Sequence, residues 1–270
     1  MRIVVVGGSG LIGAKLVTGL GEHGHEAVAA SPDTGVDTLT GEGLAGALAG
    51  ADAVIDVSDS PSSDNGSVME FFETSTRNLL AAEESACVGH HIALSVVGSE
   101  RLLDRGYFRA KTVQEKLVES SPVPYSIVHA TQFFEFARTI ADSAAEGGKI
   151  RMAPAFFQPV AGDDVARAVG RIALGPPLNG RAEVAGPEQF RMDEFFRHAL
   201  AAWNDHREVL TVPHAPYFGA ELGERTLLPG EGALLGKVRY GDWPGRIAVG
   251  SGRTGSARTL GSRTYLPAGR

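Results

Sequence analysis

Short apolar runs alternate along the chain with segments of helical periodicity. The apolar runs are rich in β-branched side chains, as in strands buried on both faces of a parallel sheet. They lie at 3–6, 27–30, 53–57, 91–96 and 125–129. Helical patterns lie at 11–20, 43–48, 68–85, 108–120 and 134–145. This alternation predicts an α/β fold with a doubly wound parallel sheet, which has helices on both faces.

The pattern changes after about residue 149. Residues 160–169 begin with acidic side chains and continue with an apolar stripe, and 183–196 has the pattern of a strand, a turn and a helix. We expect residues 1–243 to form one domain of the doubly wound (Rossmann) type, with a small C-terminal substrate lobe built mainly from 150–243. Residues 244–270 carry five arginines, no acidic residue and many Gly and Ser, which predicts a flexible tail. A basic arm for an acidic partner is the alternative.

Composition narrows the function classes. A chain of 270 residues can bury a large core, and its formal net charge of −7 argues against a nucleic-acid partner, since phosphate binding requires a basic face. No apolar run approaches the roughly 20 residues of a membrane helix. The single cysteine, Cys87, cannot form an internal disulfide, and we expect it to be buried near a helix end. We therefore predict a cytoplasmic protein without a membrane partner.

The first thirteen residues carry the strongest functional motif. Gly7, Gly10 and Gly13 directly follow the first apolar run and open the first helix. A strand-to-helix turn of this kind needs glycine where the backbone is strained, where it approaches a phosphate and where helix and strand pack closely. Helix-start N–H groups then face the anion. The motif predicts dinucleotide binding at the carboxyl edge of the sheet, with the alternative of a tight turn that binds nothing.

A second group of residues suggests hydride chemistry. Tyr107 and Lys111 lie four apart, so both project from one face of a helix, and Ser95 lies near the end of a predicted strand. A tyrosine exchanges protons with a nascent alkoxide more readily when a nearby cation stabilises its anion. We therefore predict Tyr107 as the acid/base and Lys111 as its cationic support and ribose contact, with Ser95 polarising the substrate oxygen.

These motifs resemble the short-chain dehydrogenase/reductase family, in its extended and atypical branch that includes NmrA-like proteins and nucleotide-sugar epimerases. The resemblance covers roughly residues 1–240, and it rests on 7–13, 76–82, 95–98 and 107–111. It implies that Ser95, Tyr107 and Lys111 are the catalytic set. It also implies that Asp37, matching an aspartate after the family's third strand, contacts adenine. Val57 and Ser58, matching the end of the family's fourth strand, line the adenosine ribose, and 129–134 lies beside the nicotinamide.

The expected cofactor is NADP or NAD. NAD-preferring relatives carry an acid at the end of the second strand, where this chain has Ser31, and Lys15 on the first helix could reach a 2′-phosphate. The residues thus favour NADP by a narrow margin. The predicted cofactor contacts come from the glycine turn, the ends of the second and third strands and the catalytic helix. They are Gly7, Gly10, Leu11, Ile12, Gly13, Ser31, Asp37, Val57, Ser58 and Lys111.

The leading hypothesis is an NAD(P)-dependent oxidoreductase that acts on a small carbonyl or alcohol. Phe72 stands where the extended branch usually has an asparagine, which favours instead an NmrA-like redox sensor without turnover. A nucleotide-sugar epimerase would need a cationic pocket in the lobe, to which Arg191, Arg197 and Arg207 could contribute. No histidine or cysteine cluster has metal-ligand spacing, so we predict no metal. A monomer and a homodimer are both compatible with the sequence.

Overall fold

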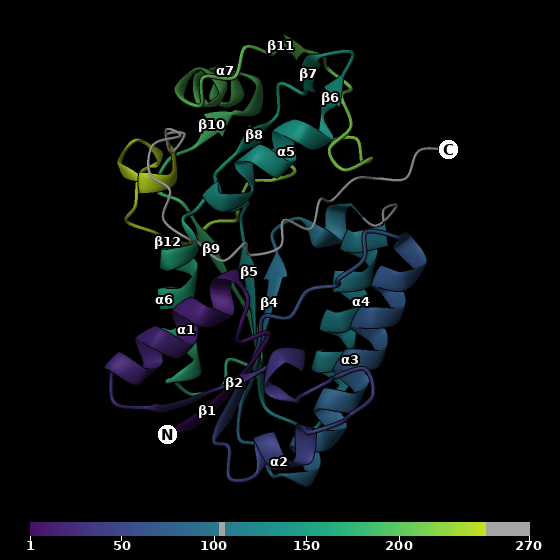
Figure 1. Ribbon diagram of the computed structural model, residues 1–270, viewed down its shortest axis with the longest axis vertical. Helices are drawn as coiled ribbons and strands as arrows, with labels where there is room; N and C mark the ends of the chain where they lie inside the picture. Colours follow the sequence, from purple (N-terminus) through teal and green to yellow (C-terminus); the bar gives the residue numbers. More distant parts are fainter. Residues whose placement is uncertain (103–105, 247–270) are drawn as a thin grey trace.

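A parallel sheet forms the centre of the molecule (Figure 1). The structure is a computed structural model and describes residues 1–102 and 106–246. Within that part of the chain the sheet has seven strands in the order β12-β9-β5-β4-β3-β1-β2. Their bounds are Arg2–Val6 (β1), Glu26–Ala30 (β2), Ala53–Asp56 (β3), His91–Val96 (β4), Tyr125–Ala130 (β5), Gly180–Ala185 (β9) and Leu234–Leu235 (β12). The doubly wound parallel sheet predicted from the sequence is confirmed.

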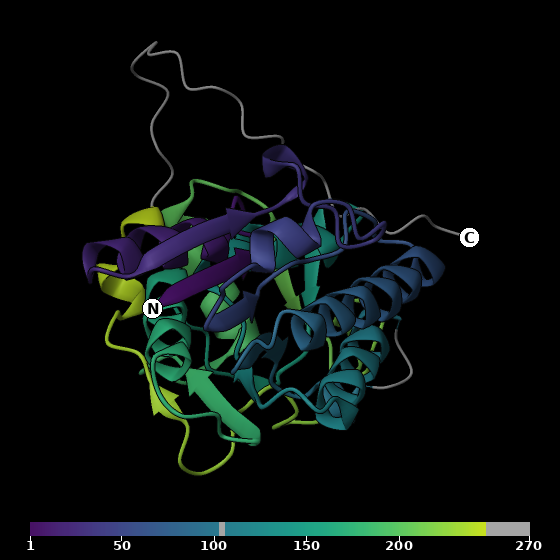
Figure 2. The same cartoon turned by 90° about the horizontal axis from the view of Figure 1, so that it is seen from below.

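Helices cover both faces of this sheet (Figures 1 and 2). The two on one face are α1 (Leu11–Glu22) and α6 (Gly162–Ala173), and the three on the other are α2 (Leu44–Leu48), α3 (Asn65–Ser85) and α4 (Gly106–Ser120). The side chains of Val4 and Val5 on β1 face these two layers and are fully buried. None of the described helices combines the length and apolar character that crossing a membrane requires.

All strands at β1 run parallel, but the order in which successive strands join the sheet reverses there, and this sets where a ligand can bind. β1 pairs with β2 on one side and with β3 on the other, so the connections leaving β1 and β2 run to opposite sides of the sheet. A crevice opens at the carboxyl edge of a doubly wound sheet at such a point. The β1–α1 turn, which carries the glycine motif, lies at this edge.

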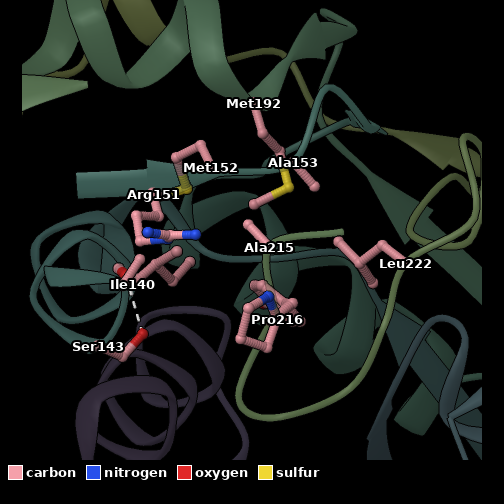
Figure 3. A pocket seen from close by; sticks show the side chains of 11 residues that line it. Ile140, Ser143, Arg151, Met152, Ala153, Met192, Ala215, Pro216 and Leu222 are labelled. Carbon is pink, nitrogen blue, oxygen red and sulfur yellow. Dashed lines mark hydrogen bonds between the residues drawn. The ribbon is translucent and has the colours of Figure 1, made fainter. Parts of the chain in front are cut away.

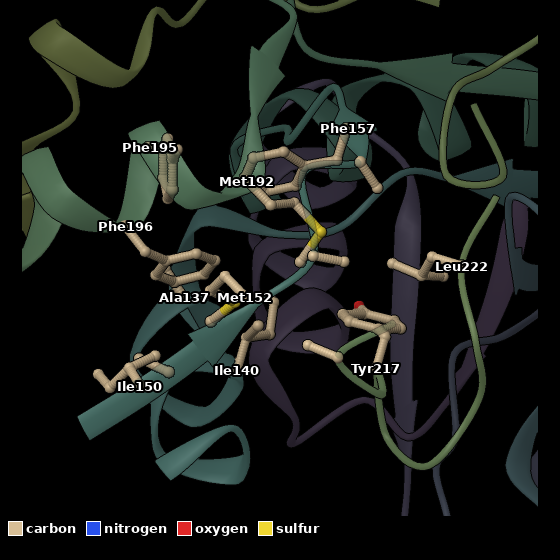
Figure 4. Packing of buried hydrophobic residues seen from close by; sticks show 14 of the residues in the cluster. Ala137, Ile140, Ile150, Met152, Phe157, Met192, Phe195, Phe196, Tyr217 and Leu222 are labelled. Carbon is tan, nitrogen blue, oxygen red and sulfur yellow. The ribbon is translucent and has the colours of Figure 1, made fainter. Parts of the chain in front are cut away.

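A smaller lobe lies beyond the carboxyl edge of the sheet. Its elements are α5 (Ala137–Ser143), β6 (Ala145–Glu146), β7 (Lys149–Met152), β8 (Phe156–Phe157), β10 (Phe190–Arg191), α7 (Met192–Ala202) and β11 (Glu208–Thr211). Its core is aromatic (Figure 4): the ring centroid of Phe157 lies 5.0 Å from that of Phe195 and 6.2 Å from that of Phe196.

Short 3₁₀ turns join elements throughout the described chain, at Pro32–Thr34, Ser99–Arg101, Phe134–Phe136, Tyr240–Asp242 and Pro244–Arg246.

The lobe differs in two ways from its prediction. The segments around 160–173 and 180–185 do not cover the site but form α6 and β9, which belong to the sheet layer. The predicted helix 134–145 is a 3₁₀ turn, Phe134–Phe136, followed by the shorter α5. The chain bends here because Phe134 N donates to Val160 O, a bond outside any helix. The predicted tail lies, from residue 247 onward, outside the described residues.

Two local expectations were wrong. Cys87 is exposed, because it follows the end of α3 in the left-handed region (φ +55°) and so turns away from the core. The family's third strand is also missing: between β2 and β3 the described chain has a 3₁₀ turn and α2 but no strand. Val57 and Ser58 therefore follow the third strand of this sheet rather than the fourth.

Candidate functional site

The glycine turn between β1 and α1 has no room for side chains at Gly7 and Gly13. Gly7 adopts φ +77°, and a Cβ at this position would lie 2.9 Å from the backbone of Ser58. A Cβ on Gly13 would lie 2.1 Å from the carbonyl oxygen of Gly7. Gly10 is the N-cap of α1, and no side chain caps this helix. The first N–H groups of α1 thus remain available to an anion, and the backbone can approach a phosphate closely.

The end of β2 carries a hydroxyl without a partner. Ser31 is only 5% exposed, and its Oγ makes no hydrogen bond, although its backbone N–H donates to Thr34 Oγ1 at 2.9 Å. A buried hydroxyl in this state is unfavourable by about 1–3 kcal/mol unless a ligand satisfies it. In a Rossmann fold the adenosine ribose of a dinucleotide lies next to the end of the second strand. A ribose hydroxyl there could bond to Ser31 Oγ.

The other predicted adenosine contacts lie near the same edge. Asp37 is half-buried, and its Oδ1 accepts a 2.7 Å bond from Leu39 N, which closes a local turn. Val57 and Ser58 are half-buried directly after β3, and Ser58 packs against Gly7. Lys15 does not face this region with a free charge, because its Nζ lies 2.6 Å from Asp163 Oδ1.

Tyr107 lies in the first turn of α4, at the carboxyl edge of the sheet. It is half-buried and packs, together with Val96 at the end of β4, against the core of the lobe. Its ring meets that of Phe72 edge-on, with 5.9 Å between the centroids. α1 and α4 both begin at the carboxyl edge of the sheet, so Tyr107 and the glycine turn share this edge.

Lys111 is buried at 3% exposure, one turn further along α4. Its Nζ donates to Leu94 O at 2.8 Å and to Gln114 Oε1, and it lies 4.4 Å from the centroid of the Phe72 ring. Burial lowers the pKa of this ammonium, and nearby carboxylates, that of Asp56 first, oppose the shift. The two hydrogen bonds and the ring surround the ammonium, so a bond to a ribose would have to replace one of these contacts.

Ser95 is the last residue but one of β4. Its side chain is 2% exposed and lies between β4 and α4, where Oγ donates to Glu115 Oε1 at 2.5 Å. Glu115 also contacts His129 Nε2, at 3.1 Å, and Arg181, at 3.2 Å. Burial raises the pKa of Glu115, but the bonds from His129 and Ser95 and the charge of Arg181 hold it below its ordinary value. The Ser95 hydroxyl is thus bonded inside the protein, and a bond to a substrate would have to replace its bond to Glu115.

Sequence reasoning missed the buried polar residues behind the site. Asp56 ends β3 at 2% exposure, and Gln114 and Glu115 on α4 are each 1% exposed. The signal for Asp56 was a carboxylate inside an apolar run, because a buried carboxylate needs partners on neighbouring elements. Gln114 and Glu115 resembled the polar face of a helix, and nothing in their spacing showed that they point inward.

The cations predicted for a diphosphate site in the lobe are already paired, and the cavity described there is small. Arg191, Arg197 and Arg207, the cations that an epimerase could use, lie within 2.6–3.6 Å of carboxylate oxygens. A cavity between α5, β7 and the segment around Pro216 (Figure 3) has a volume of about 10 Å³, room for about one water molecule. Nor does any group of three or more His, Cys, Asp and Glu in the described chain have the arrangement of a metal site.

Comparison with known proteins supports the fold. No family model matches the chain. Among curated proteins it is 26% identical over 149 residues to the photosystem II assembly factor Ycf39 of Cyanophora paradoxa, a match that covers 50% of this chain. The match spans about half of that protein's length, 46%.

Solved structures of low sequence identity have the same fold. A short-chain dehydrogenase/reductase superfamily protein from Agrobacterium tumefaciens with bound NAD is 16% identical, with a TM-score of 0.63 over 84% of this chain and 95% of its own. The UDP-glucose 4-epimerase of Thermus thermophilus in complex with NAD is 17% identical, with a TM-score of 0.64 over 84% and 92%. A hypothetical dTDP-4-dehydrorhamnose reductase from Sulfolobus tokodaii is 17% identical, with a TM-score of 0.63 over 84% of this chain and 91% of its own. The chain thus shares the Rossmann-type α/β fold of these solved structures, as its motifs predict.

Proposed function

We propose that the protein is an NAD-dependent oxidoreductase that transfers a hydride to or from a small carbonyl or alcohol substrate, with Tyr107 as the acid/base. The observation that carries the proposal is the glycine turn at the point where β1 separates the two halves of the sheet, with Tyr107 at the same edge. The buried Ser31 hydroxyl at the end of β2, which has no hydrogen-bond partner, supports a ribose contact there. The solved structures named above are of proteins with bound NAD in two cases, which supports the choice of cofactor.

The charges near Ser31 support NAD rather than NADP. The sequence favoured NADP because Lys15 could reach a 2′-phosphate, but its ammonium is paired with Asp163. Asp33, exposed in the turn directly after Ser31, adds a negative charge there. A 2′-phosphate would therefore meet repulsion without a compensating cation from the described residues around β2, whereas a 2′-hydroxyl can bond to Ser31.

Within this proposal the protein supplies the proton and the nicotinamide ring supplies or accepts the hydride. The phenol of Tyr107 donates its proton to the substrate oxygen in reduction and takes it back in oxidation. Lys111, one turn away on the same face of α4, lowers the energy of the phenolate by its charge. The Phe72 ring packs against both side chains and keeps water from the ammonium. Ser95 is held by Glu115, so we assign Ser95 a part in the packing of α4 and leave the orientation of the substrate to other groups.

The test separates binding from turnover. The purified protein is titrated with NADH and with NADPH by fluorescence, and oxidation of each is then followed across a panel of aldehydes and ketones. We expect tighter binding of NADH and turnover that falls at least about a hundredfold in Tyr107→Phe, the range of one general acid/base. Tyr125→Phe, at the start of β5, is the matched control and should keep full activity. Turnover that survives in Tyr107→Phe contradicts the assigned mechanism.

A dinucleotide-binding sensor without turnover is the second candidate. Phe72 occupies the position of the family's asparagine, and both Ser95 and Lys111 bond to groups inside the protein. These observations favour a site that binds without reacting. NADH binding with no oxidation on any carbonyl would select this candidate, whereas failure to bind either dinucleotide would contradict both.

A further inference from the structure

A buried chain of hydrogen bonds runs from Lys111 to Ser58 beneath the candidate site. Lys111 Nζ donates to Gln114 Oε1, and Gln114 Nε2 donates to Asp56 Oδ2 at 2.9 Å. Asp56 Oδ1 accepts from the backbone N–H of Ser58 at 2.9 Å and from its hydroxyl at 2.6 Å. Lys111, Gln114 and Asp56 are each 3% exposed or less. The amide of Gln114 thus bridges a buried cation and a buried anion.

The direction of this chain is fixed by chemistry. An ionised aspartate can only accept hydrogen bonds and an ammonium can only donate them. Gln114 must therefore turn its NH₂ group toward Asp56 and its oxygen toward Lys111. If residue 56 becomes a donor, the Gln114 side chain must turn its oxygen toward residue 56. The NH₂ group of Gln114 then faces the Lys111 ammonium, and both groups are donors.

The chain also links the two ends of the site. Ser58 packs against Gly7 of the glycine turn, and Lys111 shares the Phe72 ring with Tyr107. Of the carboxylates that act on Lys111, those of Asp56 and Asp59 come from β3 and the loop after it, and that of Glu115 from α4. An unbroken path of hydrogen bonds through Gln114 joins Asp56 to Lys111.

We propose that Asp56 and Gln114 are positioning residues that keep the buried Lys111 ammonium charged and fixed behind Tyr107, and that tie it to the glycine-turn side of the site. The part that concerns Tyr107 rests on the proposed function. The hydrogen-bond chain and its effect on Lys111 stand on the geometry alone, and they can be measured without substrate or cofactor.

The experiment follows the ionisation of Lys111 by NMR in protein with ¹³C-labelled lysine side chains. The chain has five lysines, and Lys111→Met identifies the signal of residue 111. In Asp56→Asn and in Gln114→Met we expect Lys111 to lose its proton at a pH lower by at least about one unit, as expected when a partner of a buried charge is lost. Gln114→Met removes the bridge but leaves the Asp56 charge in place.

The double variant Asp56→Asn with Gln114→Glu tests the direction of the chain. The amide introduced at position 56 then donates to the carboxylate introduced at position 114, which accepts from Lys111. The bond between positions 56 and 114 now runs in the opposite direction, but every donor again has an acceptor and the net charge is unchanged. We expect Lys111 in this variant to keep its proton to at least as high a pH as in the wild type. An effect of Asp56→Asn with none of Gln114→Met would overturn the role of Gln114, and failure of the double variant to recover would overturn the directed chain.

The outcome for the proposed function is read separately, from NADH binding to the wild-type protein. If the variants behave as expected but NADH does not bind, the proposed function fails and the hydrogen-bond chain stands. If NADH binds but the titration of Lys111 is the same in all variants, the chain fails and the proposed function stands.

Discussion

A Cβ at Gly13 would disrupt the backbone of the glycine turn. At Gly13 a methyl group would lie 2.1 Å from Gly7 O, a distance that backbone atoms cannot relieve by rotation. We expect Gly13→Ala to abolish NADH binding and to lower the free energy of unfolding by about 1–3 kcal/mol, the range for an overpacked site. Calorimetric titration with NADH and urea unfolding measure the two effects.

Gly19 on the same helix is the matched control. A Cβ there would meet no atom within 4 Å, and alanine is the better helix former. Gly19→Ala should keep NADH binding and raise the free energy of unfolding by up to about 1 kcal/mol. Normal NADH affinity in Gly13→Ala would show that the turn is not the phosphate site.

Sequence reasoning succeeded at residues whose role depends on the local backbone. The glycine motif was predictable because strand, turn and helix follow one another directly in the chain. The bond from Ser95 to Glu115 could not be predicted, because β4 is buried on both faces and no polar alternation reveals which way the Ser95 hydroxyl points. The roles of Ser95, Tyr107 and Lys111 in catalysis stay predictions.

At the scale of elements, strands were more predictable than the connections between them. The bounds of β4 were predicted to the residue, and α3 begins three residues before its prediction because Asp64 accepts from Ser67 N and caps it. The absence of a strand between β2 and β3 could not be foreseen, because that strand was expected from the family resemblance and not from an apolar run. The 3₁₀ turn at Phe134–Phe136 depends on a bond to Val160, which is distant in sequence.

The pairing of β4 with β5 carries a pH dependence through His90. This side chain is 4% exposed, and its Nε2 lies 2.8 Å from Ser126 Oγ, which accepts from Leu178 N. Burial, with the neighbouring His91 charge, lowers the pKa of His90 from 6.5 to about 4. The unfolded chain thus binds a proton at a higher pH than the folded one, so this contribution to stability is complete above pH 6.5 and is lost as the pH falls toward 4.

The free energy of unfolding of the wild type falls between pH 6.5 and 4, and we expect this fall to be about 3 kcal/mol smaller in His90→Gln. Urea unfolding of the wild type and the variant across this range measures the difference, in which the titration of the carboxylates cancels. His206→Gln, at an exposed histidine, should follow the wild-type curve. A His90→Gln curve parallel to that of the wild type would contradict the buried neutral histidine.

At the scale of the whole molecule, the chain after β12 fastens the sheet layer to the lobe. Asp164, in the first turn of α6, accepts from the backbone N–H of Lys237 at 2.9 Å and of Val238 at 2.8 Å. The segment then packs its aromatic rings on the lobe side, with the Tyr240 centroid 4.5 Å from that of Phe195. One buried carboxylate thus fixes where this segment leaves the sheet.

Asp164→Ala should loosen that segment, and Asp163→Ala provides a matched control one residue away. Both residues lie in the first turn of α6, so both variants lose the same favourable interaction with the helix dipole. Asp164 is 5% exposed and its loss leaves two N–H groups without their charged acceptor, which should lower the free energy of unfolding by about 2–3 kcal/mol. Asp163 is half exposed and pairs with Lys15, an interaction of less than about 1 kcal/mol. Hydrogen exchange should show the amides of Lys237 and Val238 deprotected in Asp164→Ala alone, and equal protection in both variants would mean that other contacts hold the segment to the sheet.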